Sequence, residues 1–126
     1  MIELKNIFIF ILLFVWFSGC TTQIAHKERP PASPREEASI QLTHEGLQRL
    51  QEGNFDGAIR LLEQAIGLNP NNGQSYYYLA QAWLKKGMFS EAKEFNRLAQ
   101  TYLKDDKNWL MKADKQAIQI SRMEKQ

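Results

Sequence analysis

From position 39 onward the residues repeat with a period of 34, and this repetition constrains the fold more than any other feature of the chain. Periods of about 20–50 residues are typical of arrays in which one supersecondary unit is stacked several times. When the sequence is aligned with itself at an offset of 34 residues, small residues pair with small ones and large apolar residues with large apolar ones. Two unrelated amphipathic hairpins are therefore the disfavoured alternative. The identical pairs are Gly53 with Gly87, Phe55 with Phe89, Ala58 with Ala92 and Ala65 with Ala99.

Each unit is predicted to be a hairpin of two helices that approach each other closely. Gly46 and Ala80 are expected to face Ala58 and Ala92 across the two hairpins. A larger side chain at such a crossing overpacks the interface, which typically costs about 1–3 kcal/mol. The pattern therefore predicts small residues where the helices cross.

The turn inside each unit is predicted from a glycine with a phenylalanine two positions later. Gly53 and Gly87 are expected to end the first helices, because a left-handed residue after a helix has little steric cost only for glycine. Asp56 and Ser90 are the predicted N-caps of the second helices, since their side-chain oxygens can accept from free backbone N–H groups.

The C-terminal segment, residues 107–125, is predicted to form a fifth helix that covers the last hairpin. Its apolar residues recur at helical spacing, and charged residues between them suit a solvated side. The apolar residues are Leu110, Ala113, Ala117 and Ile120, with Trp109, Ile118 and Met123 expected to widen the same face.

Segments 39–72 and 73–106 resemble tetratricopeptide repeats, whose period is 34. The resemblance implies an all-α fold, in which two helix-turn-helix repeats and a C-terminal capping helix (residues 107–126) form a short right-handed α-solenoid. The chain departs from the family at Glu45, Arg49, Asn96 and Lys104, where apolar residues or proline are usual. The residues that carry the resemblance are Gly46, Gly53, Phe55, Ala58, Ala65 and Pro70 in the first repeat, and Ala80, Gly87, Phe89, Ala92 and Ala99 in the second.

The resemblance also implies a binding scaffold whose first helices line a groove for a peptide or helix of a partner protein. Three consecutive tyrosines, Tyr76 to Tyr78, spread over roughly 200° of a helix, so not all three can be buried. Tyr77 and Tyr78 either contact a partner or cover neighbouring helices. The groove positions are Thr43, Leu47, Leu50, Tyr77, Gln81, Leu84 and Lys85, continued by Met111 and Lys115.

No group of residues in the sequence points to catalysis, a metal or a cofactor. His26 and His44 lie far apart in the sequence, and the glycines are spaced as helix terminators rather than as a phosphate-binding loop. A net charge of +2 is too small for a nucleic-acid footprint. We therefore expect a chain that is not an enzyme and binds neither metal nor cofactor nor nucleic acid.

The first 19 residues are predicted to be a signal peptide. Residues 7–17 are eleven consecutive apolar residues, too few to span a bilayer but typical of a secretory leader. The following Phe17-Ser18-Gly19-Cys20 resembles a bacterial lipobox, which implies that Cys20 is lipidated and becomes the new N-terminus. An uncleaved anchor is the alternative. Thr21 after the cysteine resembles the outer-membrane sorting pattern of Gram-negative lipoproteins.

Residues 20–38 are predicted to be a tether, because they hold three of the four prolines and little apolar periodicity. Ser33-Pro34-Arg35-Glu36 at its end is a helix-start signal, which places the beginning of the first helix near Pro34.

The whole pattern predicts a membrane-anchored, non-catalytic adaptor that recruits or helps to assemble a cell-envelope complex for secretion, pilus or outer-membrane assembly. A self-associating structural module of the envelope is the alternative.

Overall fold

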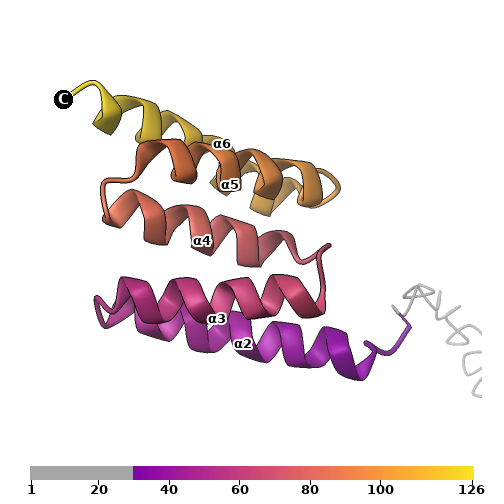
Figure 1. Ribbon diagram of the computed structural model, residues 1–126. Coiled ribbons are helices and arrows are strands. Elements are labelled where there is room, and N and C mark those ends of the chain that lie inside the picture. Colours follow the sequence, from indigo (N-terminus) through magenta and orange to yellow (C-terminus); the bar gives the residue numbers. More distant parts are fainter. Residues whose placement is uncertain (1–29) are drawn as a thin grey trace, which may run out of the picture. The chain divides into compact units, whose positions relative to one another are not determined.

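The computed structural model describes residues 30–126, which contain five α-helices and no strand. The helices pack as two successive hairpins, α2 with α3 and α4 with α5, and α6 then packs against α5 and α4 (Figure 1). This arrangement confirms the predicted all-α solenoid. The predicted leader, Cys20 and the tether up to residue 29 lie outside the described residues. The helices are α2 (Pro34–Gln51), α3 (Phe55–Leu68), α4 (Gly73–Lys85), α5 (Phe89–Tyr102) and α6 (Lys107–Glu124).

Helix α2 begins where its start signal predicts. Ser33 is the N-cap, Pro34 is the first helical residue, and the Ser33 hydroxyl accepts a hydrogen bond from the Glu36 backbone N–H at 3.2 Å. Residues 34–38 are therefore helical, although the sequence boundaries assign them to the tether.

The turns inside the two hairpins confirm the role of the glycines but correct the predicted N-caps. Gly53 and Gly87 have φ angles of 77° and 75°, the left-handed region that glycine adopts without strain. The N-cap of α3 is Asn54, whose Oδ1 accepts from the Gly57 N–H at 2.9 Å. The N-cap of α5 is Met88, which makes no such bond. The predicted caps Asp56 and Ser90 lie inside their helices, because the helices already begin at the preceding phenylalanines.

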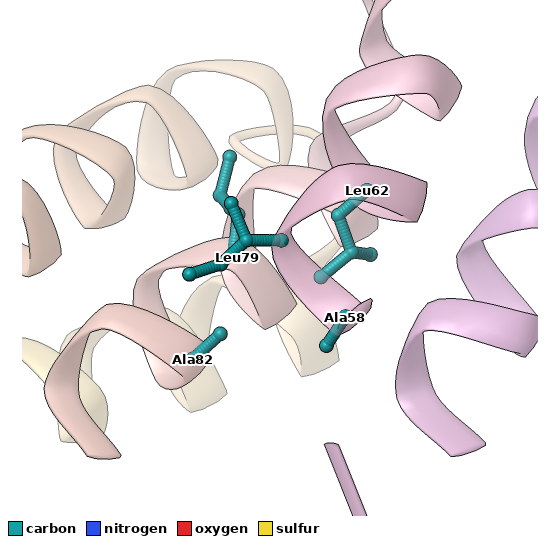
Figure 2. Close-up of a cluster of buried hydrophobic side chains, with 5 residues drawn as sticks. Ala58, Leu62, Leu79 and Ala82 are labelled. Atoms are coloured by element: carbon teal, nitrogen blue, oxygen red, sulfur yellow. The ribbon is translucent and has the colours of Figure 1, made fainter. Parts of the chain in front are cut away.

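Small residues bring the helices of the first hairpin together, as the sequence predicts. A Cβ atom added to Gly46 would lie 2.7 Å from Cγ of Leu62, so α2 and α3 leave no room for a side chain there. Leu62 packs in turn with Ala58, Leu79 and Ala82 in a buried cluster (Figure 2). This cluster joins α3 to α4, and so joins the first hairpin to the second.

Helix α6 covers the last hairpin with a narrower apolar face than the sequence predicts. Ala113 and Ile120 are fully buried, whereas Ile118 and Met123 are 61% and 39% exposed. Gln116 is buried between Ala113 and Ile120, because residues spaced three and four apart share one side of a helix. The prediction that Ile118 and Met123 widen the buried face is therefore wrong, since both side chains are exposed.

Candidate functional site

The first helices of the array, α2, α4 and α6, form one layer, because α4 contacts both of the others. Each carries a row of side chains that reach solvent, and the 34-residue period places the three rows in the same register. We call this surface the first-helix face. It consists of Ile40, His44, Leu47 and Gln51 on α2; Gln74, Tyr78, Gln81 and Lys85 on α4; and Asn108, Lys112, Lys115 and Gln119 on α6.

An aromatic cluster lies along the seam between α4 and α6. The rings of Tyr77 and Tyr78 meet edge to face at a centroid distance of 5.3 Å, and Trp109 meets them at 5.5 and 5.9 Å. Such pairs are worth about 0.5–1.5 kcal/mol beyond the area that they bury. All three rings are half-buried, so the cluster holds α6 on α4 and still offers ring surface to a partner.

Polar groups complete the seam beside these rings. The buried Gln116 side chain donates from Nε2 to the Tyr77 carbonyl at 3.0 Å and to Gln81 Oε1 at 3.1 Å. Gln81 is thereby fixed in orientation, while its own amide nitrogen has no hydrogen-bond partner among residues 30–126. That nitrogen can donate to a carbonyl oxygen of a bound peptide.

The charges on the first-helix face are all positive. Lys85, Lys112 and Lys115 are exposed, and no acidic residue belongs to the three rows. The Lys112 ammonium lies 4.0 Å from the centroid of the Trp109 ring, a cation–π contact that places positive charge over the seam. The face therefore suits a segment that brings a carboxylate or other acidic group.

The tyrosines of the seam remain neutral at physiological pH. Burial raises the pKa of Tyr77 above its ordinary value of 10.0. The pKa of Tyr78 is also raised, chiefly by burial and to a smaller extent by the neighbouring Tyr77. Their hydroxyl groups are thus available as hydrogen-bond donors.

The structure divides the seven groove positions expected from the sequence. Leu47, Tyr77 and Gln81 are half-buried and Lys85 is exposed, so these four reach the surface. Leu50 is also half-buried, but it packs against the core cluster between α3 and α4.

The remaining two groove positions, Thr43 and Leu84, are buried and have no surface to offer a partner. The Thr43 hydroxyl lies 2.6 Å from that of Ser75 and accepts from Asn72 Nδ2 at 3.1 Å, so it joins α2 to α4. Leu84 is 2% exposed, because Ala92 of α5 and Ile120 of α6 pack over it. This corrects their expected role.

Sequence reasoning anticipated Lys115 on α6 but missed seven members of the face, which are Ile40, His44 and Gln51 on α2, Gln74 on α4, and Asn108, Lys112 and Gln119 on α6. A signal for Gln74 was present, since Gln74, Tyr78, Gln81 and Lys85 follow the i, i+4, i+7, i+11 spacing of one helix face. No signal on α6 alone distinguishes Asn108, Lys112 and Gln119 from an ordinary solvated side.

The arrangement supports non-covalent recognition. Within residues 30–126, no group of three or more His, Cys, Asp or Glu residues is placed to hold a metal ion. Over the same range, no helix has both the length and the apolar character needed to cross a bilayer.

Comparison with known proteins agrees with the geometry. Residues 49–114, more than half of the chain, match the family model described as tetratricopeptide repeat. No curated protein matches the chain. Tetratricopeptide repeats generally mediate protein–protein interactions and are typically not catalytic. The chain belongs to the tetratricopeptide repeat family.

Proposed function

We propose that this protein is a membrane-anchored adaptor that binds a segment of a partner protein on its first-helix face and so recruits or helps to assemble a cell-envelope complex. The observation that carries the proposal is the seam between α4 and α6, where aromatic rings, the Gln81 amide and the Lys112 ammonium lie together on one surface. Aromatic residues are enriched at the energetic centres of protein interfaces.

The chemistry of the seam favours a short peptide or helix with at least one acidic group. The exposed edges and faces of the Tyr78 and Trp109 rings can contact an apolar side chain of the partner. Lys112 and Lys115 attract a carboxylate. Two repeats and one cap offer a short surface, so we expect micromolar or weaker affinity, as is usual for interfaces at the small end of the range.

The proposed anchor is Cys20, which would carry the lipid and become the N-terminus once the leader is removed. It is supported by the eleven apolar residues 7–17, which end at the first residue of Phe17-Ser18-Gly19-Cys20. One acyl chain binds a membrane only marginally, whereas several chains on one residue hold it firmly. We place the anchored protein in the bacterial cell envelope, at the periplasmic face of the outer membrane if the cell is Gram-negative.

The first-helix face is tested by crosslinking and pull-down of the anchored protein from membranes, followed by identification of the captured proteins. Tyr78→Ala and the pair Lys112→Glu with Lys115→Glu are expected to lose the specific partner. Lys104→Glu is the matched control, because Lys104 is exposed in the loop between α5 and α6 and lies outside the face. A list of partners that all variants share would reject the face as the binding surface.

The anchor is tested separately with Cys20→Ser. We expect this variant to keep the leader, to run at the higher mass and to lose lipid labelling. If it instead runs at the mass of the processed form and stays in the membrane fraction, lipidation at Cys20 is wrong, whatever the outcome for the first-helix face.

A further inference from the structure

Helix α6 occupies the place of a first helix, and among residues 30–126 no second helix pairs with it as α5 pairs with α4. One period separates Leu84 of α4 from Ile118 of α6. Leu84 is 2% exposed because α5 and α6 cover it, whereas Ile118 is 61% exposed. Equivalent positions in one array thus differ in whether a covering helix is present.

The uncovered side of α6 is slightly hollowed and carries small residues. A shallow hollow of about 590 Å³ lies over Ala117, Ile118, Ser121, Arg122, Lys125 and Gln126. Ala117 and Ser121 are small, and small residues let two helices approach closely, as Gly46 does in the first hairpin. The hollow lies outside the rows that form the first-helix face.

The charges around Ile118 are basic and lack ionic partners. Arg122 and Lys125 form no salt bridge within the part of the chain that the structure describes. The acidic groups of α6 are engaged elsewhere, since Asp114 accepts from Gln100 at 2.8 Å and Glu124 pairs with Lys93. Like charges would face each other if two copies met through α6, which disfavours a second copy as the occupant.

We propose that this uncovered side of α6 docks an amphipathic helix of a partner protein that carries small apolar residues flanked by aspartate or glutamate. The helix takes the position over Ile118 that α5 takes over Leu84, where Ala92 makes the contact. Its acidic residues pair with Arg122 and Lys125. This docking is independent of the first-helix face and adds a second partner surface to the protein.

The probes are two dye-labelled synthetic peptides built on residues 88–103, the stretch that covers α4 in the chain itself. The acidic peptide carries Lys93→Glu and Arg97→Glu, and the basic peptide carries Glu91→Lys and Glu94→Lys. Fluorescence anisotropy with the full chain in a non-ionic detergent is expected to show saturable binding of the acidic peptide, at least about tenfold tighter than that of the basic one.

The variants then locate the binding. Ile118→Asp is expected to weaken binding of the acidic peptide about tenfold, and Arg122→Glu combined with Lys125→Glu is expected to reverse the preference between the peptides. The matched control is Ile40→Asp, which changes a 44% exposed isoleucine on α2 at the other end of the array. Because Ile118 and Ile40 are both exposed, circular dichroism should show both variants folded.

Three results would overturn the proposal. The first is equal affinity for the two peptides or no saturable binding, and the second is acidic-peptide binding that Ile118→Asp leaves unchanged. The third is self-association of the chain without peptide, seen by sedimentation and abolished by Ile118→Asp, which would assign the surface to a second copy.

Discussion

Asn96 of α5 donates a hydrogen bond from Nδ2 to Oε1 of Gln116 on α6 at 2.8 Å, and both side chains are 3% exposed. Asn96 Nδ2 also donates to the Ala113 carbonyl at 2.8 Å, and Gln116 in turn reaches the Tyr77 carbonyl and Gln81 on α4. Two buried amides thus connect three helices, at the position where the sequence departs from the apolar residue usual in the family.

We expect Asn96→Leu to destabilise the protein by about 1–3 kcal/mol. The change leaves Gln116 Oε1 buried without the donor that Asn96 supplies and removes the second hydrogen bond of the Ala113 carbonyl, and a buried group without a partner carries its full desolvation cost. The free energy of unfolding is measured by urea denaturation. Asn96→Leu combined with Gln116→Leu should cost less than the sum of the single changes. Strictly additive losses would show that the pair is not coupled.

Gly46→Ala and Gly67→Ala are expected to act in opposite directions. At Gly46 a Cβ would lie 2.7 Å from Leu62 Cγ, so overpacking should cost about 1–3 kcal/mol. Gly67 lies in α3 with open space around it and an ordinary helical φ, so alanine there should stabilise by about 0.5–1 kcal/mol. Thermal unfolding of the two variants checks both signs, and equal shifts would contradict the close approach of α2 and α3.

Met88→Asn is expected to stabilise α5 by about 0.5–2 kcal/mol. Met88 is the N-cap of α5 without a side-chain bond, and one period earlier Asn54 caps α3 through its Oδ1. Met88 is 42% exposed, so little packing is lost. Asn54→Met is the reciprocal variant and should lose a similar amount in urea denaturation. Ser90→Ala, at the mistaken cap position, should change little.

Alkaline pH is expected to destabilise the protein through the three consecutive tyrosines. Burial raises the pKa of Tyr76, Tyr77 and Tyr78 above their ordinary value of 10.0. As the pH rises, the tyrosines of the unfolded chain therefore lose their protons before those of the folded protein. The contribution of these tyrosines to the free energy of unfolding is complete below pH 10.0 and is lost as the pH rises through their pKa values in the folded protein. Tyrosinate absorbance follows the titration, and Tyr78→Phe should remove one late step. Ionisation of all three near the ordinary value would contradict burial of the seam.

The sequence was sufficient for the features that depend on local geometry. The period, the apolar spacing and the start signal at Ser33 predicted the helices, and Gly53 and Gly87 predicted the turns because only a residue that tolerates positive φ ends a helix in that way. The predicted N-caps of α3 and α5 lie two residues after the observed ones. The glycine–aromatic turn is so short that the phenylalanines are already helical, which moves the cap to Asn54 and Met88.

Only the tertiary structure decided which side chains face a partner and which hold the helices together. Thr43 and Leu84 follow the same helical spacing as surface residues, but α4 covers the first and α5 and α6 cover the second. Ile118, predicted to be buried, is exposed because none of the helices among residues 30–126 packs over it. The sequence by itself determined the repeat and its helices, since these follow from periodicity along the chain. Accessibility depends on which neighbouring helix lies over a residue, and that is a property of the packed array alone.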